Sequence, residues 1–327
     1  MKKKLLAGLV AGAMALSLCA CGGGEEAAED TSAEATYTVG VCQLVEHVAL
    51  DAATQGFQDA INDEMGEGVV DIDVQNAQND SNTCSTIVNG FVSADVDLIL
   101  ANATPALQAA AAGTSDIPIL GTSITEYGVA LEIDDFSGTV GGNISGTSDL
   151  APLDQQAAMV KEWFPDAKTV GLLYCSAEAN SQYQIDVVKA ELEALGYTCE
   201  VYPFSDSNDL SAVCTSAANA SDVIYVPTDN TVAANTGIID NICRPAKVPV
   251  IAGEEGICSG CGVATLSISY YDLGYTTGQM AVKILTGEAD IATMAIEYTD
   301  VTKKYNEAIC AELGLTVPDG YEAIVME

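Results

Sequence analysis

The chain has 327 residues, 47 of them acidic and 11 basic, so its formal net charge at pH 7 is −36. A hydrophobic content of 49% excludes an intrinsically disordered protein, and the length predicts two lobes or one large domain. The acidic balance argues against a nucleic-acid partner, because phosphate binding needs clustered Lys and Arg side chains.

Residues 1–20 have the pattern of a secretory signal peptide. The lysines Lys2 to Lys4 precede an apolar run, Leu5 to Leu18, that is too short to span a membrane. The Leu-x-Ala-Cys sequence that ends this region resembles the bacterial lipobox, which implies cleavage before Cys21 and a lipid on that cysteine. An ordinary cleaved signal followed by an unmodified cysteine is the alternative.

Residues 21–36 form a predicted tether. After Cys21 the segment contains five acidic residues and no aromatic or large aliphatic side chain. Such a segment buries too little apolar surface to order itself. We therefore expect an exported body of residues 37–327, held by a lipid at the outer face of the cytoplasmic membrane as in Gram-positive bacteria.

From residue 37 onward, short apolar runs alternate with segments of helical periodicity. In the first half, strands are predicted at 37–42, 69–74, 97–101 and 117–121, and helices at 49–65, 83–94 and 105–112. After a Gly- and Ser-rich break at 138–148, helices are predicted at 151–164, 181–195, 210–220, 231–243 and 273–285, and strands at 168–174, 197–202, 222–226, 248–252 and 262–267. Such repeats predict an α/β fold with two Rossmann-like, doubly wound parallel-sheet lobes.

In this class of fold, ligands bind beyond the carboxyl ends of the strands, so the residues that follow each predicted strand are candidate binding residues. In the first half these are Gln43, His47, Asn102, Ala103, Thr104, Thr122 and Ser123. In the second half they are Ser176, Glu178, Asn180, Ser181, Thr228, Asp229, Asn230 and Glu254. For any single position, helix capping explains such a residue as well as ligand contact does. Together they predict a binding cleft between the lobes.

Eight stretches of the body carry a resemblance to a known family. They are residues 41–47 (VCQLVEH), 73–76 (DVQN), 101–105 (ANATP), 142–149 (GNISGTSD), 171–174 (GLLY), 225–230 (YVPTDN), 253–256 (GEEG) and 264–274 (ATLSISYYDLG). Through them the chain resembles bacterial solute-binding proteins of ABC importers with the type I periplasmic-binding fold. More narrowly, it is similar to the tryptophan/tyrosine-type substrate-binding lipoproteins of Gram-positive bacteria.

The resemblance implies that a monomer captures a small molecule by hinge closure and delivers it to a membrane permease. An aromatic amino acid is the favoured ligand; another amino acid, a sugar, a nucleoside-like solute or a sensing role are the alternatives. The implied first lobe comprises residues 37–144 and 268–290, and the second comprises 145–267 and 291–327. Three hinge crossovers are expected near Ser145, Ser267 and Asp290.

A free amino acid would present a carboxylate, an ammonium group and a side chain to this cleft. Residues 102–105 and 122–123 can offer hydroxyls and helix N-terminal N–H groups to the carboxylate. By strand position, Asp229 and Glu254 are best placed to hold the ammonium.

His47 and Tyr174 are the candidates to flank an aromatic ligand side chain. A solvated loop histidine is an equally good interpretation of His47, because one histidine carries little information. Tyr270 and Tyr271 lie at an expected hinge and are predicted to be packing residues.

Nine cysteines follow Cys21. The closest pair is Cys258 and Cys261, in a predicted loop, and an exported location favours a disulfide between them over zinc. Free, buried thiols are the second interpretation.

An exported hydrolase is the competing functional class. His47 is the only histidine, which excludes most His-rich metal sites and leaves a catalytic triad a single possible base. No G-x-S-x-G motif is present, and the adjacent carboxylates of Glu254 and Glu255 lack the spacing of a two-carboxylate site. We therefore expect no enzymatic activity, no metal and no cofactor.

Overall fold

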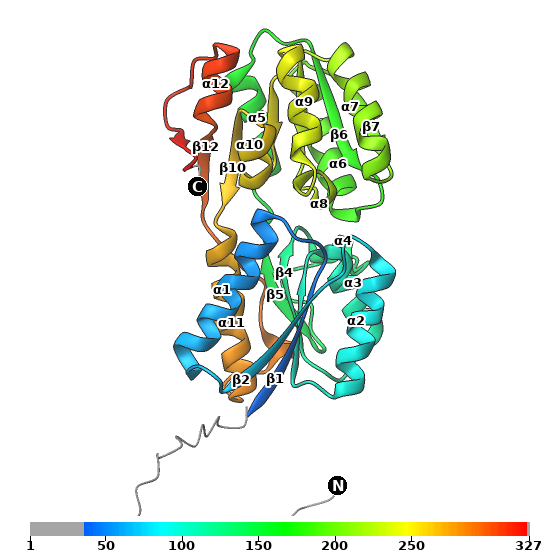
Figure 1. Ribbon diagram of the computed structural model, residues 1–327, viewed down its shortest axis with the longest axis vertical. Coiled ribbons are helices and arrows are strands. Elements are labelled where there is room, and N and C mark those ends of the chain that lie inside the picture. Colours follow the sequence, from blue (N-terminus) through cyan, green and yellow to red (C-terminus); the bar gives the residue numbers. More distant parts are fainter. Residues whose placement is uncertain (1–35, 326–327) are drawn as a thin grey trace, which may run out of the picture. The chain divides into compact units, whose positions relative to one another are not determined.

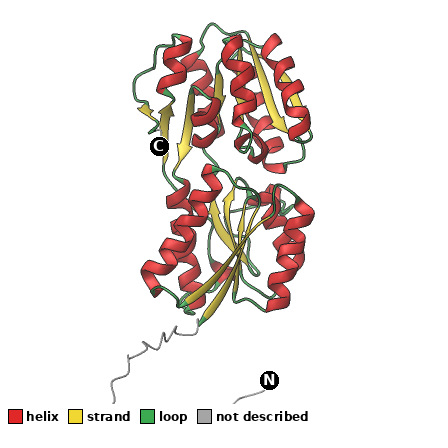
Figure 2. Cartoon of the chain, viewed as in Figure 1, coloured by secondary structure: helices red, strands yellow, loops and turns green. Residues whose placement is uncertain are grey.

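The computed structural model describes residues 36–325. The predicted signal peptide, Cys21 and nearly all of the predicted tether lie outside the described residues. The described chain folds into two lobes, each built on a β-sheet with helices on both faces (Figures 1 and 2). This architecture confirms the predicted fold class. Within residues 36–325, no helix has the length and apolar composition needed to cross a membrane.

The first lobe contains a six-stranded sheet in the order β11-β5-β4-β3-β1-β2, with every neighbouring pair parallel. Its strands are β1 (Tyr37–Gln43), β2 (Val70–Asn76), β3 (Leu98–Asn102), β4 (Ile119–Ile124), β5 (Ile144–Ser148) and β11 (Glu297–Tyr298). One face carries α2 (Ser81–Ala94), α3 (Thr104–Gly113) and α4 (Tyr127–Ala130), and the other carries α1 (Val48–Met65), α11 (Tyr270–Leu285) and the 3₁₀ turn η1 (Ile291–Thr293). Because both faces are covered, a central strand such as β3 is buried along its whole length and largely apolar.

The second lobe contains a seven-stranded sheet in the order β13-β12-β10-β9-β8-β6-β7, in which β12 runs antiparallel to β10. Its strands are β6 (Thr169–Cys175), β7 (Thr198–Phe204), β8 (Val223–Val226), β9 (Val250–Ala252), β10 (Ala264–Ile268), β12 (Val301–Tyr305) and β13 (Glu322–Ala323). One face carries α5 (Leu153–Trp163), α6 (Ala179–Ala194) and α12 (Glu307–Leu313), and the other carries α7 (Ser207–Ala220), α8 (Asn230–Ala233), α9 (Thr236–Ala246) and α10 (Glu255–Cys261).

The structure corrects the predicted lobe boundaries. Residues 144–148, predicted as part of a break and mostly assigned to the second lobe, form β5, which pairs with β4 in the first sheet. Residues 291–298, also assigned to the second lobe, form η1 and β11, and β11 extends the first sheet. The crossovers therefore lie at 149–152, 269 and 299–300. The second is near Ser267 as predicted, whereas the first and third lie beyond Ser145 and Asp290.

The composition of β5 explains this error. All five of its residues are buried, yet its sequence, ISGTS, lacks the apolar run that marks a buried strand. Its hydroxyls are satisfied by other elements: Ser145 Oγ donates to the carbonyl oxygen of Met294 at 3.1 Å, and Thr147 Oγ1 lies 2.8 Å from Thr277 Oγ1. Polar side chains can be buried at this strand because these partners satisfy their hydrogen bonds.

Two further predictions in the second lobe are wrong. The helix predicted at 231–243 is divided into α8 and α9. The predicted loop that holds Cys258 and Cys261 is helix α10, and the two thiols are free and buried in an apolar core. Cys261 Sγ donates instead to the carbonyl oxygen of Ile257 at 3.3 Å. Within residues 36–325 all nine cysteines are free.

Helices α1 and α11 pack against each other on the first lobe (Figure 1). This contact returns the chain to the first lobe after the second crossover, as the family resemblance implies. Three glycines, Gly56, Gly274 and Gly278, lie where the two backbones meet. A Cβ on Gly274 would lie 1.9 Å from the carbonyl oxygen of Ala53, so no larger residue fits without moving a helix.

We predict that Gly274→Ala lowers the free energy of unfolding by at least about 1–3 kcal/mol, the usual cost of overpacking, because the clash is with backbone atoms. Gly90→Ala in α2 is the matched control. An added Cβ there has nothing within 4 Å, and the substitution is expected to stabilise by about 0.5–1 kcal/mol. Urea unfolding measures both changes; a Gly274→Ala variant as stable as the original protein would contradict the close helix contact.

Candidate functional site

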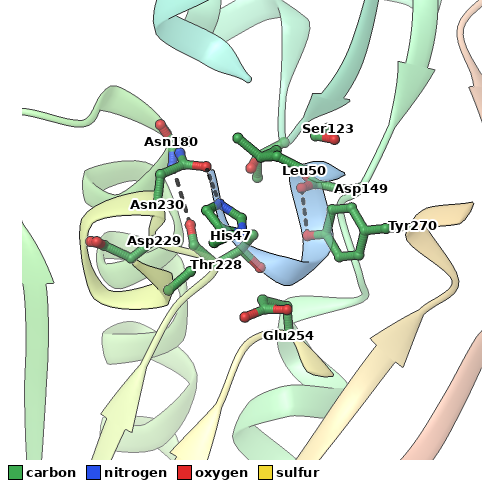
Figure 3. Close-up of a pocket in the computed structure, with 12 residues that line it drawn as sticks. His47, Leu50, Ser123, Asp149, Asn180, Thr228, Asp229, Asn230, Glu254 and Tyr270 are labelled. Atoms are coloured by element: carbon green, nitrogen blue, oxygen red, sulfur yellow. Dashed lines mark hydrogen bonds between the residues drawn. The ribbon is translucent and has the colours of Figure 1, made fainter. Parts of the chain in front are cut away.

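A small cavity lies between the lobes, where strands of both sheets end (Figure 3). Its volume is about 10 Å³. The residues that line it are His47, Leu50, Ser123, Thr125, Asp149, Asn180, Thr228, Asp229, Asn230, Ala233, Glu254 and Tyr270. This volume is about the space of one water molecule, so a larger solute enters only when the lobes or the lining side chains move apart.

The cavity brings together about half of the predicted binding residues. Those that line it are His47, Ser123, Asn180, Thr228, Asp229, Asn230 and Glu254. Those that do not are Gln43, Asn102, Ala103, Thr104, Thr122, Ser176, Glu178 and Ser181. For the seven lining residues, ligand contact stays a prediction. The other eight lie outside the cavity wall.

Gln43 and Asn102 connect the first sheet to α1. Gln43 Oε1 accepts from Thr54 Oγ1 at 2.6 Å, and Gln43 Nε2 donates to Asp51 Oδ1 at 2.6 Å. Asn102 Nδ2 donates to the carbonyl oxygen of Leu50 at 2.9 Å and to Thr54 Oγ1 at 3.0 Å. These bonds fix the helix that carries Leu50 into the cavity wall.

Glu178 organises the second-lobe wall without lining the cavity. Its buried carboxylate accepts from Asn230 N at 3.0 Å, Asn230 Nδ2 at 2.7 Å, Thr231 N at 2.9 Å and Thr231 Oγ1 at 2.7 Å. Asn180 Nδ2 also donates to it at 3.2 Å. Glu178 thereby holds the first turn of α8 and orients the amides of Asn180 and Asn230.

Asp229 and Glu254 serve as helix N-caps. Asp229 accepts from Val232 N at 2.9 Å and from Cys175 N at 2.7 Å, and its carboxylate points away from the other labelled side chains (Figure 3). The two oxygens of Glu254 accept from the first N–H groups of α10. Burial raises the pKa of Asp229 to about 8 and that of Glu254 to about 7. Helix capping, the alternative considered for such residues, therefore explains why both carboxylates are at these positions.

Asp149 and Tyr270 are two of the five lining residues that the sequence did not reveal; the others are Leu50, Thr125 and Ala233. Tyr270 Oη donates to Asp149 Oδ2 at 2.9 Å, and both residues line the cavity. Burial raises the pKa of Asp149 to about 6. Asp149 ends one of the family-like stretches, but the strand before it was not recognised. Tyr270 was predicted to be a packing residue, whereas Tyr174, the predicted flanking residue, donates to Gln182 Oε1 and does not line the cavity.

The two lobes touch each other at and beside the cavity. His47 Nε2 lies 3.3 Å from Asn230 Oδ1, and Asn79 Nδ2 donates to Thr231 Oγ1 at 3.0 Å. The pKa of His47 is lowered, chiefly by burial, so its imidazole is neutral at pH 7. His47 is therefore partly enclosed rather than a freely solvated loop histidine.

Three buried polar atoms of the cavity wall have no hydrogen-bond partner: Ser123 Oγ, Asp149 Oδ1 and Asn180 Oδ1. Ser123 also has a left-handed backbone, with φ of 56°, at an irregularity in the pairing of β4 and β5. Non-glycine residues rarely adopt this conformation, and it recurs where a side chain has a functional role. Across residues 36–325, no group of three or more His, Cys, Asp and Glu side chains is arranged to hold a metal ion.

We predict that the unliganded protein becomes more stable as the pH falls from 8 to 5. The raised pKa values of Asp149, Glu254 and Asp229 mean that the folded protein binds protons in this range that the unfolded chain, with carboxyl pKa values near ~4, does not. Their stabilising contribution is full at low pH and is lost as the pH rises through about 6, 7 and 8. The lowered pKa of His47 acts in the opposite direction as the pH falls, but it is one group against three.

The thermal midpoint of ligand-free protein, measured against pH, tests this prediction. Glu254→Gln should flatten the dependence because it removes one of the three groups. Glu67→Gln, at an exposed position, is the matched control and should leave the slope unchanged. A midpoint that falls or stays constant between pH 8 and pH 5 would show that the carboxyl groups are not buried in this way.

Comparisons with known proteins agree with this geometry. Residues 38–324 match the family described as ABC transporter substrate binding protein. A tyrosine-binding protein of Clostridioides difficile (strain R20291) is 35% identical over 313 residues, which cover 91% of this chain and 89% of that protein.

Two solved structures are also similar. An ABC domain from Streptococcus pneumonia in complex with L-Trp has a TM-score of 0.84 at 32% identity, and a ligand-free, open substrate-binding protein from Clostridium difficile has a TM-score of 0.68 at 38% identity. In both comparisons the aligned region covers 89% of this chain and 100% of the other chain. The chain is thus closer in structure to the complex, although the open protein is closer in sequence. With the family match extending over nearly all of the described residues, this chain belongs to the ABC transporter substrate-binding proteins, and it resembles the members that bind aromatic amino acids.

Proposed function

We propose that this protein is an extracellular receptor that captures an amino acid between its lobes and delivers it to the permease of an ABC importer. The observation that carries the proposal is the set of unpartnered atoms Ser123 Oγ, Asp149 Oδ1 and Asn180 Oδ1 around one cavity. A buried polar atom without a partner costs about 1–3 kcal/mol, so a polar ligand that bonds to all three is strongly favoured. A carboxylate and an amide oxygen suit an ammonium group, and a hydroxyl can donate to a ligand carboxylate.

An aromatic amino acid is the ligand that the lining and the relatives favour. Leu50 and Ala233 give the cavity apolar surface, and the rings of His47 and Tyr270 give it planar surface. A tyrosine-binding protein and an L-Trp complex are among the similar proteins. None of the lining residues is Lys or Arg, whereas Asp149, Asp229 and Glu254 are acidic, so an anionic ligand is disfavoured.

Ligand capture would stabilise the closed arrangement of the lobes. Ser123 belongs to the first lobe, Asn180 to the second and Asp149 to the first crossover, so one ligand that bonds to all three bridges both lobes. A ligand shifts a conformational equilibrium by its preference for one state, and this bridging exists only when the lobes are closed. The predicted lipid on Cys21 and the monomeric state are part of this proposal, since both would keep a single receptor beside its permease.

We expect tryptophan, tyrosine or phenylalanine to raise the thermal midpoint of the ligand-stripped body, residues 37–327, by several degrees. Ligand at 100 times its Kd stabilises the folded state by about 2.7 kcal/mol. Aspartate and glutamate should give no shift. The measurement is a thermal-shift panel of the 20 amino acids, common sugars and nucleosides, followed by calorimetry of each ligand found.

Asn180→Ala should weaken the shift because it removes an amide from the cavity wall. Asn89→Ala, on the exposed surface of α2, is the matched control and should leave the shift unchanged. If only sugars or nucleosides raise the thermal midpoint, the ligand is not an amino acid. Absence of any shift across the panel would remove this cavity as a solute site.

A further inference from the structure

Asp149 lies on one connection between the lobes, and Tyr270 directly follows another. Asp149 is the first residue of the first crossover, and Tyr270 begins α11 directly after the second crossover. The hydrogen bond from Tyr270 Oη to Asp149 Oδ2, at 2.9 Å, joins the two connections beside the cavity (Figure 3). Both residues are buried, with 5% of Asp149 and 6% of Tyr270 exposed.

Asp149 differs from the other carboxylates at this cavity in its free oxygen. Asp229 and Glu254 bond through both oxygens to backbone N–H groups, and Glu178 accepts bonds from Asn180, Asn230 and Thr231. Asp149 Oδ1 has no partner, although it is buried and lines the cavity. Burial removes the water molecules that would bond to this carboxylate, and only one of its two oxygens has a hydrogen-bond partner in the protein. A cationic donor would bond to the second oxygen and offset the buried negative charge.

The pair is built into the first lobe. Asp149 N donates to the carbonyl oxygen of Ile124 at the end of β4, at 3.1 Å. Tyr270 packs in an apolar cluster with Ala49 and Ala53 of α1. The backbone of Asp149 and the ring of Tyr270 are therefore both anchored on the first lobe, and Ile268 of β10 is the second-lobe member of the cluster around Tyr270.

We propose that Asp149 binds the ammonium group of the ligand through Oδ1, and that Tyr270 is a positioning residue that holds the carboxylate in place for it. This inference rests on the proposed function and specifies which ligand group the receptor recognises first. Because the pair belongs to the first lobe, the amine docks there, and Asn180 of the second lobe reaches the ligand when the cleft closes. A free amine is then the feature that a ligand must have, and its carboxylate contributes less.

Three forms of one ligand test the proposal by calorimetry on the body, residues 37–327: L-tryptophan, N-acetyl-L-tryptophan, which lacks the ammonium, and tryptamine, which lacks the carboxylate. The L-tyrosine series is measured in parallel. Removing one member of a buried charge pair is expected to weaken binding at least about 100-fold, and removing a neutral hydrogen bond about 10-fold. We therefore expect N-acetyl-L-tryptophan to bind more weakly than tryptamine; the reverse order would overturn the proposal.

Asp149→Asn keeps the shape of the side chain and removes the charge. It is expected to weaken L-tryptophan binding at least about 100-fold, while the thermal midpoint of the unliganded variant stays the same or rises because a buried charge is gone. Asp154→Asn, at an exposed position five residues along, is the matched control. Unchanged affinity in Asp149→Asn would overturn this inference and leave the proposed function intact, whereas failure of the unmodified protein to bind any amino acid would overturn the proposed function itself.

Tyr270→Phe tests the positioning role through the pH at which binding weakens. Binding should weaken as the pH falls and Asp149 becomes protonated. The hydroxyl of Tyr270 favours the ionised carboxylate, so its removal should weaken binding and raise the pH at which this loss occurs. The other titratable groups that face Asp149 are Glu254, the N-cap of α10, and Tyr127 from α4, and both are unchanged in this variant. Weaker binding with the original pH dependence would show that Tyr270 is only a packing residue.

Discussion

Four carboxylates, those of Asp149, Glu178, Asp229 and Glu254, are buried where the two lobes meet. A buried charge without partners costs several kcal/mol, so each of them has to be satisfied within the protein or by something that enters the cavity. Helix N-termini supply the partners for three. The first N–H groups of α8 bond to Glu178 and Asp229, and those of α10 bond to Glu254. The second-lobe wall is therefore fixed by capping, before any ligand is considered.

The first lobe and the crossovers provide the unsatisfied side of the site. Ser123 Oγ and Asp149 Oδ1 have no partner there, and Asn180 Oδ1 faces them from the second lobe. Direct bonds between the lobes, such as those that join His47 to Asn230 and Asn79 to Thr231, are neutral and individually weak. A ligand with an ammonium group would add the charged interaction that these contacts lack. Under the proposed function, this arrangement would let one small molecule decide whether the lobes are closed.

Most of the fold could be predicted because its signals are local. A strand covered on both faces, such as β3 with five buried residues, reads as a continuous apolar run, and the helices between such strands have their own periodicity. Strand β5 is equally buried but consists mainly of Ser, Thr and Gly residues. Its hydroxyls are satisfied by groups about 130–150 residues away, such as Thr277 and Met294, and a local pattern cannot show partners at that distance. Because β5 was not predicted as a strand, the boundary between the lobes was placed before it instead of after it.

The sequence by itself determined which polar residues stand at the ends of the strands, and seven of the predicted binding residues line the cavity for that reason. Only the tertiary structure decided which of their atoms remain free. Asp229 and Asp149 are the same residue type and both follow a strand. Helix α8 begins immediately after Asp229 and its N–H groups bond to that carboxylate, whereas Asp149 is followed by a crossover and a proline before α5 begins. The free oxygen of Asp149 is thus a consequence of where the next helix starts, which the folded chain fixes and the residue type does not.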